Sequence, residues 1–283
     1  MAEPAPLVSV VIPTFNNAHV IGHCLRSLRA QTYREIEVLV IDALSSDETV
    51  SIAQADAHVL SYSHSIPAED GPRFGAPYQR NYGAAAAHGQ YVCLIDADME
   101  LEGTVIEQCV QLCESRGADA VIIPEESFGV GYWAACKALE RRCYRNDNVI
   151  EAPRFVKRSV WQAIGGLAPE MGADDWDLHA RLKARGYTVG RVAATIRHNE
   201  GNLTLSRLAR KRFVYGCSVL PYLRTHPPFD QLSLVVRRSY VRRWRSLAAY
   251  PLHAAGVGVM RTVEMAAAGA GVISALLALS RRR

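Results

Sequence analysis

The sequence lacks several features that would assign it to a common class of protein. Its seven cysteines include no Cys-x-x-Cys pair. Cys109 and Cys113 are four residues apart, which suits one face of a helix better than a zinc site. The first ten residues, MAEPAPLVSV, have no basic segment followed by a long apolar run, so we expect no secretory signal. We therefore expect free thiols in a reducing compartment, without a disulfide framework or a cysteine metal site.

Acidic residues are scarce at the end of the chain. Residues 206–283 contain 14 Lys and Arg but only two acids, whereas residues 1–205 contain 18 basic and 26 acidic residues. The same segment has two uncharged runs, residues 246–260 and 265–280, with Arg261 and Glu264 between them. Each run is shorter than the roughly 20 residues that a membrane-spanning helix needs. Arg261 and Glu264 are three residues apart and could pair on one helix face.

Basic and aromatic residues flank these apolar runs. RRSYVRRWRS precedes them, with Tyr240 and Trp244 among arginines, and RRR follows. This combination is typical of helices on an anionic membrane surface, so we expect a helical tail attached peripherally or monotopically to the inner, cytoplasmic face of the cell membrane. The alternative is a helical hairpin packed on the body or in a dimer interface. Nucleic acid is not expected as a partner, because the apolar runs would have no role in binding it.

Short apolar strands alternate with helical patterns over the first 125 residues, which predicts an α/β fold with a mostly parallel sheet and helices on both faces. Beyond residue 125 we expect a helix over residues 131–145 and another in DDWDLHARLKARG, residues 174–186. The expected strands of the first part are residues 7–13, 36–42, 57–62, 91–96 and 119–124, and its expected helices are residues 18–31, 45–55, 76–89 and 103–116.

Two carboxylates, Asp96 and Asp98, end the strand in QYVCLIDADMEL, with only Ala97 between them. In open parallel sheets, ligands bind outside the carboxyl ends of the strands. Two acids held this close favour a divalent cation, which removes their repulsion. Mg²⁺ or Mn²⁺ typically takes one or two carboxylates together with phosphate oxygens, so the motif indicates a metal that carries phosphates. The alternative is a solvated Asp-x-Asp turn.

Polar residues also end the neighbouring predicted strands. Asp42 ends the second strand, and Pro13, Thr14 and Phe15 end the first in a turn that could offer backbone groups and a ring to a nucleotide base. Arg80 precedes the strand of the two acids and is a planar cation suited to a phosphate or a base. Taken singly, each could instead be a helix cap, a turn residue or a solvated arginine.

The segments VSVVIPTFNN, EVLVIDALSSDET, QRNYGAA, YVCLIDADM and GADDWDLHARLKARGY together resemble the family 2 glycosyltransferases of GT-A fold. The resemblance covers roughly residues 7–200. It implies a GT-A (Rossmann-like) catalytic domain over residues 1–205, with a nucleotide-sugar half about 1–124 and an acceptor half about 125–205. Residues 206–283 would form the basic, apolar helical tail.

The resemblance implies a metal-assisted, inverting transfer of a sugar from a nucleotide-diphosphate sugar to an acceptor hydroxyl. A UDP-sugar is favoured over a GDP- or dTDP-sugar as donor, and the acceptor is a saccharide or a lipid-linked molecule. Thr14, Phe15 and Asp42, with Pro13, would contact the base and ribose of the donor. Arg80 would lie beside the base or the phosphates.

The resemblance also implies a metal site and a catalytic base. Asp96 and Asp98 match the Asp-x-Asp motif that binds the donor through Mg²⁺ or Mn²⁺, with Asp98 the more direct ligand. His198, in IRHNEG, stands where some GT-A enzymes supply a third metal ligand, although it could equally be an ordinary surface or core histidine.

The segment ADDWDL would supply the base. Asp175 matches the catalytic base, and Asp174, Trp176 and Asp177 would lie on the acceptor side. Trp176 and Trp161 could stack on a sugar, or could simply be packing aromatics.

One segment departs from the family pattern. The family usually reads Asp-Asp-Gly-Ser after the second strand, whereas this chain reads Asp42-Ala43-Leu44-Ser45. The loss of the second acid and the glycine puts the usual turn geometry in question and leaves open a catalytically silent binding or scaffold protein. A nucleotidyltransferase is a further alternative, but it would want a lysine- and glycine-rich phosphate loop that IPTFNNAHVIGH lacks.

Overall fold

The computed structural model describes residues 4–63, 75–147, 150–168, 174–225 and 238–280. The chain divides into two compact units. Unit 1 comprises Met1–Pro124, Ala152–Pro169 and Leu178–His198, and unit 2 comprises Glu125–Glu151, Glu170–Asp177 and Asn199–Arg283.

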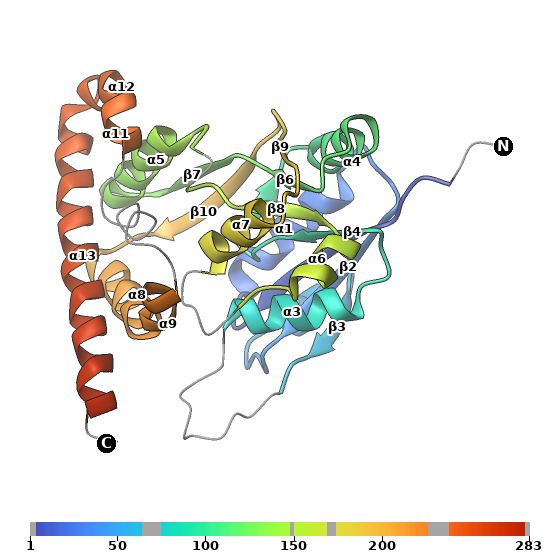
Figure 1. Ribbon diagram of the computed structural model, residues 1–283, viewed down its shortest axis with the longest axis horizontal. Helices are drawn as coiled ribbons and strands as arrows, with labels where there is room; N and C mark the ends of the chain where they lie inside the picture. The colour runs from blue at the N-terminus through green and yellow to red at the C-terminus, as the bar shows by residue number, and fades with distance from the viewer. Residues whose placement is uncertain (1–3, 64–74, 148–149, 169–173, 226–237, 281–283) are drawn as a thin grey trace. The chain divides into compact units, whose positions relative to one another are not determined.

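Unit 1 is built on a seven-stranded sheet with the strand order β3-β2-β1-β4-β8-β6-β9 (Figure 1). The pairs β1–β2, β2–β3, β1–β4 and β6–β9 are parallel, and β8 runs antiparallel to both of its neighbours. The prediction of a mostly parallel sheet is therefore confirmed. The strands are β1 (Val8–Thr14), β2 (Ile36–Asp42), β3 (His58–Ser61), β4 (Tyr91–Leu94), β6 (Ala120–Ile122), β8 (Pro153–Lys157) and β9 (Val189–Arg191).

Helices cover both faces of this sheet because its strands are apolar on both sides. Successive side chains of a strand point to opposite faces. Val10 of β1 lies in the core with α1 and α4, whereas Val11 lies in the core with α3, α6 and α7. The helices of unit 1 are α1 (Ala18–Arg29), α2 (Thr49–Ala53), α3 (Ala76–Ala86), α4 (Val105–Arg116), α6 (Arg158–Ile164) and α7 (Asp174–Ala184), of which α7 begins in unit 2.

Helix α1 shows how directly the sequence specifies this packing. Its buried side chains are the residues that recur at helical spacing in the sequence, Val20, Ile21, Cys24, Leu25 and Leu28. Burial of each large aliphatic side chain contributes about 1.5–3 kcal/mol to the free energy of unfolding. The amphipathic stripe therefore fixes which face of α1 meets the sheet.

The cysteines and one tryptophan belong to the cores. All seven cysteines are free thiols, as predicted, and Cys109 and Cys113 lie buried on one face of α4. Burial raises the pKa of the Cys93 thiol to about 12, so this thiol stays protonated at neutral pH. Trp161 is buried in the core with α3 and α7, which supports the packing alternative for this residue.

Five strands escaped the sequence prediction, namely β8 and β9 of the large sheet and β5, β7 and β10 of a second, three-stranded sheet. In unit 1, Met99–Leu101 (β5) pairs antiparallel with the start of β10 (Ile196–Asn202), with His198 opposite Met99. In unit 2, the rest of β10 lies beside β7 (Glu125–Val130). The strand β10, IRHNEGN, has no apolar alternation because most of its side chains are polar, so the sequence carries no strand signal there.

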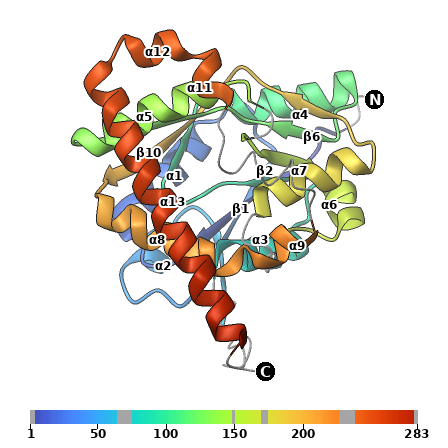
Figure 2. The same ribbon diagram turned by 60° about the vertical axis from the view of Figure 1, so that its left-hand side comes forward.

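Unit 2 is mainly helical. Its apolar core contains Leu139 of α5 (Tyr132–Tyr144), Leu208 of α8 (Leu205–Ser218) and Met260 of α13 (Pro251–Ser280). Both views of the ribbon show α13 running along α8 (Figure 2). The remaining helices of unit 2 are α9 (Leu220–Thr225), α11 (Arg238–Arg242) and α12 (Trp244–Ala248).

The two apolar runs of the tail form one continuous helix instead of a hairpin. Helix α13 has 30 residues, and the predicted pair is present in its middle, with Arg261 Nη1 2.6 Å from Glu264 Oε2. Within the described part of the chain, α13 is the one helix long and apolar enough to cross a membrane by length and composition. The two runs, each too short by itself to span a membrane, therefore lie in one longer helix, because the paired charges allow the helix to continue through them.

Candidate active site

The loop after β2 is held in place by the carboxylate of Asp42. This side chain is 2% exposed. Its Oδ1 accepts hydrogen bonds from Thr14 Oγ1 at 3.0 Å and Ser45 Oγ at 2.6 Å, and its Oδ2 accepts one from the backbone N–H of Ser45 at 2.8 Å. The side chain of Asp42 therefore connects the end of β1, through Thr14, to the loop after β2, through Ser45.

The turn at the departure from the family pattern keeps a conformation that favours glycine. Leu44 stands where the family has glycine, and its φ is +60°, in the left-handed region. Its side chain is 59% exposed, so the strained backbone is not held by burial of the leucine. The hydrogen bonds from Ser45 to Asp42 hold the turn instead. The loss of the glycine has therefore not removed the turn.

The loops after β1 and β2 are laced together by further hydrogen bonds. The backbone N–H of Asn16 donates to Ser45 Oγ at 2.8 Å, and the N–H of Ser46 donates to Asn16 Oδ1 at 2.9 Å. Pro13 and Thr14 are buried in β1, whereas Phe15 is 59% exposed. The ring of Phe15 is therefore presented on the surface beside a rigid pair of loops.

Gln79 is a residue of this region that the sequence analysis missed. It lies buried on α3, and its Nε2 donates to the carbonyls of Thr14 at 2.9 Å and Ile41 at 2.6 Å. Gly83, one turn later, allows the close approach, since a Cβ there would lie 2.4 Å from Val11 Cγ1. The sequence indicates Gln79 only by its position, since it is an amide side chain directly before Arg80 in the predicted helix.

Asp96, which follows β4, is held between two arginines. Arg80 of α3 forms an ion pair and hydrogen bond with its Oδ1, and Arg154 Nη2 of β8 lies 3.6 Å from its Oδ2. Burial by itself would raise the pKa of Asp96, but Arg80 and then Arg154 outweigh it and hold that pKa well below its usual range. Asp96 is therefore a carboxylate at neutral pH. Arg154 was missed, although an arginine inside the apolar strand PRFVK is a sequence signal for a buried partner.

Asp98 faces His198 instead. The Nε2 of His198 on β10 lies 3.4 Å from Asp98 Oδ2. The other oxygen, Oδ1, is buried and has no hydrogen-bond partner among the described residues. Such an orphaned carboxylate oxygen is costly unless a cation or donor binds it. An imidazole nitrogen and a carboxylate side by side are a donor set that fits a divalent transition metal such as Mn²⁺.

The three expected metal ligands in unit 1 therefore make different ion pairs. Asp98 and His198 face each other, while Asp96 is engaged by Arg80 and Arg154. In the part of the chain that the structure describes, no three His, Cys, Asp or Glu side chains gather closely enough to hold a metal by themselves. Among the described residues, Asp98 and His198 are therefore a two-residue donor set.

The residues expected on the acceptor side lie at the start of α7, in unit 2. Asp175 is exposed, Trp176 is half-buried and Asp177 is buried. Acids in the first turn of a helix are stabilised by the helix dipole, which explains why this acidic segment starts a helix. The side chain of Asp174 lies outside the described part. An exposed Asp175 is accessible to an external hydroxyl group.

The family model and the relatives that match this chain are all glycosyltransferases. The model of the family described as Glycosyl transferase family 2 matches residues 9–141. The PGL/p-HBAD biosynthesis glycosyltransferase of Mycobacterium tuberculosis is 26% identical over 269 residues, which cover 92% of this chain and 96% of that protein. Glycosyltransferase GlyG of Streptococcus pneumoniae is 29% identical over 116 residues, which cover 41% of this chain and only 38% of GlyG.

Solved structures agree at the level of the fold. The mannosyltransferase PcManGT from Pyrobaculum calidifontis, in complex with GDP-Man and Mn²⁺, matches with a TM-score of 0.63 at 19% identity, over 97% of this chain and 88% of that one. Residues 1–349 of Staphylococcus aureus TarS, in complex with UDP, match with a TM-score of 0.54 at 14% identity, over 95% of this chain and 89% of that one. The predicted GT-A fold is confirmed by these neighbours.

Proposed function

Because this chain is a glycosyltransferase that belongs to glycosyl transferase family 2 and has the GT-A fold, we propose that it transfers a sugar from a nucleotide-diphosphate sugar to an acceptor hydroxyl. The transfer is a single displacement that inverts the anomeric carbon and is assisted by Mg²⁺ or Mn²⁺. The observation that carries the proposal is the buried, unpartnered oxygen of Asp98 beside His198.

Asp98 and His198 are the proposed protein ligands of the cation, and the diphosphate of the donor would complete the coordination. When bound, the cation offsets the negative charge that develops on the nucleoside diphosphate as it leaves. An imidazole ligand favours Mn²⁺ over Mg²⁺, because Mg²⁺ strongly prefers oxygen ligands. The neighbouring structure of PcManGT contains Mn²⁺, which is consistent with this choice.

Asp96 acts through its two arginines. The carboxylate of Asp96 pairs with both Arg80 and Arg154 beside the strand end. A guanidinium whose position is already fixed by a partner loses little conformational entropy when it binds phosphate oxygens. Arg80 is therefore the proposed phosphate or base contact of the nucleotide, positioned by Asp96.

The loops after β1 and β2 are the proposed site of the nucleoside. Phe15 is exposed beside them and could stack on the base, while Pro13 and Thr14 shape the loop. Asp42 already accepts three hydrogen bonds from its own chain, so its main contribution is to hold this loop for the base and ribose. UDP is the first nucleotide to test, with GDP and dTDP after it, since TarS binds UDP and PcManGT binds GDP-Man in their structures.

Asp175 is the proposed catalytic base. An acceptor hydroxyl has a high pKa and needs a base within hydrogen-bond reach as it attacks. Asp175 is exposed in the first turn of α7, and Asp174, Trp176 and Asp177 surround it in the sequence as the proposed acceptor-side residues.

The acceptor is proposed to be a saccharide or a lipid-linked molecule. The mycobacterial relative that matches nearly end to end is named for PGL/p-HBAD biosynthesis, so acceptors of that pathway are the first to test. Attachment to the inner, cytoplasmic face of the membrane would bring a lipid-linked acceptor within reach of the enzyme. This attachment is supported by the basic, apolar helices of the tail.

A thermal-shift panel on the purified protein tests the proposal. UDP, GDP, dTDP and CMP are each added with and without Mn²⁺ or Mg²⁺. A ligand that binds only the folded state adds about 2.7 kcal/mol to its stability at a hundred times the Kd. We expect a metal-dependent shift with one nucleotide, and its loss in Asp98→Asn but not in the neighbouring Arg197→Ala. A protein that responds to no nucleotide would support the catalytically silent alternative.

A further inference from the structure

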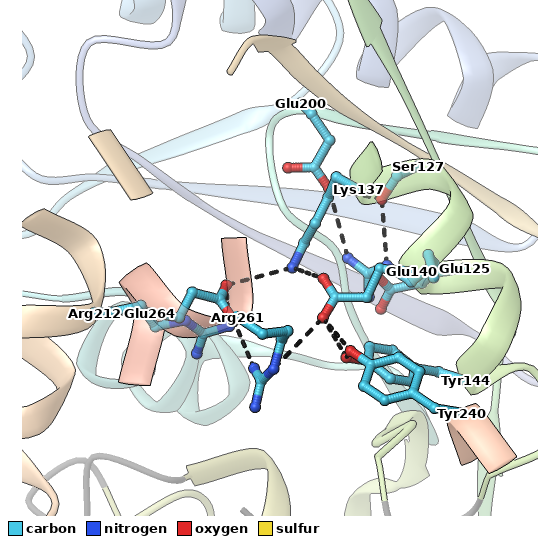
Figure 3. Close-up of polar contacts among 11 residues, drawn as sticks. Glu125, Ser127, Lys137, Glu140, Tyr144, Glu200, Arg212, Tyr240, Arg261 and Glu264 are labelled. Carbon is cyan, nitrogen blue, oxygen red and sulfur yellow. Dashed lines mark hydrogen bonds and ion pairs between the residues drawn. The ribbon is translucent and has the colours of Figure 1, made fainter. Parts of the chain in front are cut away.

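Five charged side chains join α13 to α5 and α8 within unit 2 (Figure 3). Lys137 Nζ of α5 lies between two glutamates, 2.6 Å from Glu140 Oε2 and 3.7 Å from Glu264 Oε1 of α13. Arg212 Nη2 of α8 lies 3.1 Å from the same Glu264 oxygen. Arg261 of α13 reaches both glutamates, with Nη1 2.6 Å from Glu264 and Nε 3.9 Å from Glu140. We call these five residues the α13 charge cluster.

The cluster is largely buried and each of its members has an ion-pair partner, so it is a fixed connection. Glu140 and Glu264 are 0% and 1% exposed. The hydroxyls of Tyr144 and Tyr240 both donate to Glu140, Tyr240 at 2.7 Å, which adds α11 to the connection. Removing one partner from a buried ion pair leaves an uncompensated charge. Separation of α13 from α5 and α8 would therefore leave these charged side chains without their ion-pair partners.

Small residues extend this connection along α8. A Cβ at Gly216 of α8 would lie 2.1 Å from the carbonyl oxygen of Ala268, and a Cβ at Gly271 of α13 would lie 2.2 Å from the carbonyl oxygen of Phe213. Backbones that meet this closely form a continuous contact that larger side chains would break. The middle of α13 is thus packed backbone to backbone on α8.

These connections conflict with a membrane crossing by α13. A spanning helix needs about 20 residues in the hydrocarbon. Every 20-residue stretch within Pro251–Ser280 includes both Arg261 and Glu264. A crossing would therefore draw the whole α13 charge cluster, and with it the polar helix α8, into the bilayer. Charged side chains at that depth are strongly unfavourable.

The side of α13 away from α5 and α8 is uncharged from end to end and mostly apolar. Its two charged residues both belong to the buried cluster, so no charged side chain of this helix faces outward. A helix of this length is about 45 Å long at about 1.5 Å per residue, which is a long uncharged surface. The exposed large side chains on it are Leu252, Val259, Met265, Ile273, Leu276, Leu277 and Leu279.

Exposed basic and aromatic side chains accompany this apolar surface on α8, α11 and α12. Trp244 is exposed with the guanidinium of Arg245 5.7 Å from its ring, and Tyr215 is exposed with Lys211 Nζ 5.9 Å from its ring. None of the exposed basic residues of these helices, nor Arg243 between α11 and α12, forms an ion pair within the described ranges. They are Arg207, Arg210, Lys211, Arg242, Arg243 and Arg245.

The unpaired basic residues distinguish a lipid surface from a second copy of the chain. In a symmetric dimer the same patch occurs on both subunits, so the arginines of one copy would approach those of the other. An anionic lipid surface instead supplies the opposite charge, and interfacial aromatics suit its headgroup layer. We infer that α13 lies in the plane of an anionic bilayer surface, fixed to the enzyme by the α13 charge cluster, and does not cross the membrane. This inference goes beyond glycosyl transfer and can be tested without any activity.

Flotation of the full-length protein with sealed vesicles tests whether a lipid surface covers the exposed side of α13. We expect binding to vesicles of phosphatidylcholine with 30% phosphatidylglycerol, and at least tenfold weaker binding by Arg242→Ala/Arg243→Ala/Arg245→Ala, since each basic residue near such a surface contributes about a fivefold factor. The matched control removes three exposed arginines of unit 1, Arg26→Ala/Arg34→Ala/Arg116→Ala, and should bind as wild type. Equal binding by all three proteins would overturn the inference. So would a lipid-free dimer that Ile273→Glu/Leu277→Glu converts to a monomer.

The orientation of α13 is tested on the same vesicles with a tag added at the C-terminus. A helix in the surface plane leaves the tag on the side of the enzyme, so external protease removes it from sealed vesicles. A crossing helix carries the tag into the lumen, where it is cut only after detergent is added. We expect complete removal without detergent from protein bound to the vesicles and from protein in native membranes oriented with the cytoplasmic face outward. Protection of the tag in either preparation would overturn the in-plane placement.

Discussion

Asp98 Oδ2 and His198 Nε2 lie 3.4 Å apart, although the two residues are far apart in the sequence. The strand pairing of β5 with β10 brings them together, because His198 lies opposite Met99 in the register. Asp98 then presents a second, buried oxygen without a hydrogen-bond partner in the described part of the chain. This relationship turns an ordinary strand-end motif into a two-residue donor set.

The first prediction concerns that pair. Asp98→Asn and His198→Ala should each lower metal-dependent transfer by about 100- to 1,000-fold, the usual effect of removing one group that stabilises developing charge. They should also abolish the Mn²⁺-dependent part of nucleotide binding, measured by calorimetry. Arg197→Ala is the control, because Arg197 is exposed and pairs with Glu100. Mn²⁺-dependent binding that persists in both site variants would place the metal elsewhere.

The second prediction concerns the proposed base. Asp175→Asn should bind donor nucleotide normally but turn over at least 100-fold more slowly, since general bases typically contribute about 10²–10⁴-fold. Initial rates at saturating donor, together with donor binding by calorimetry, separate the two effects. Lys183→Ala, an exposed substitution on the same helix α7, should change neither quantity. Wild-type turnover by Asp175→Asn would show that another group takes the proton.

The third prediction concerns the left-handed turn at Leu44. A side chain at a φ of +60° costs about 1–2 kcal/mol, part of which glycine returns as entropy of the unfolded chain. Leu44→Gly should therefore raise the free energy of unfolding by about 0.5–1 kcal/mol in urea denaturation. Ala43→Gly, one residue earlier and without a positive φ, should lower it by about 0.4–1 kcal/mol. A loss of stability in Leu44→Gly would mean that the leucine side chain stabilises the turn by contacts.

The fourth prediction concerns the pH dependence of the α13 charge cluster. Burial would raise the pKa of Glu140, but Lys137 and the tyrosine hydroxyls outweigh it and hold that pKa well below its usual range. A lowered carboxyl pKa stabilises the folded state above the unfolded pKa of about 4.3, and this stability is lost as the pH falls below that value. Glu140→Gln should therefore cost about 3–5 kcal/mol at pH 7, the usual cost of stranding a buried partner charge.

The difference between wild type and Glu140→Gln should shrink as the pH falls below about 4.3, because the wild-type carboxylate then takes up a proton on unfolding. Urea denaturation followed by circular dichroism from pH 7.5 to pH 3.5 measures both stabilities. The double variant Lys137→Met/Glu140→Leu is the control, since replacing both partners of a buried pair by apolar residues is often nearly neutral. A constant difference across this range would show that Glu140 does not titrate with unfolding.

Most strands and helices of the first 124 residues could be predicted because each carries its own periodic signal, whereas β8, α6 and β9 of unit 1 were missed. The residues 36–42 form β2 with the predicted bounds, and the apolar stripe of α1 is buried as its spacing indicates. The short strands β5, β7 and β10 could not be predicted in this way. They are held by pairing with a distant partner strand, and the sequence IRHNEGN has no alternation that indicates a strand.

The ion-pair partners of the site residues also could not be predicted from the local sequence. The sequence indicated Asp96 and Asp98 as a pair, but the structure directs Asp96 to Arg80 and Arg154 and Asp98 to His198. Each partner comes from a different element, and the distance along the chain carries no information about which side chains meet. The same holds for Gln79, whose two acceptors are carbonyls at the ends of β1 and β2.

The sequence by itself determined the α/β class, the family and the acidic strand ends, because periodicity, composition and short motifs are local properties of the chain. Only the tertiary structure decided that Arg261 and Glu264 do not interrupt the tail. Lys137 and Arg212, from two other helices, neutralise Glu264 in the interior, so the helix continues through its charged middle. Charges that separate two apolar runs in the sequence thus fix one long helix to the protein, because the cost of burying a charge depends on which groups surround it.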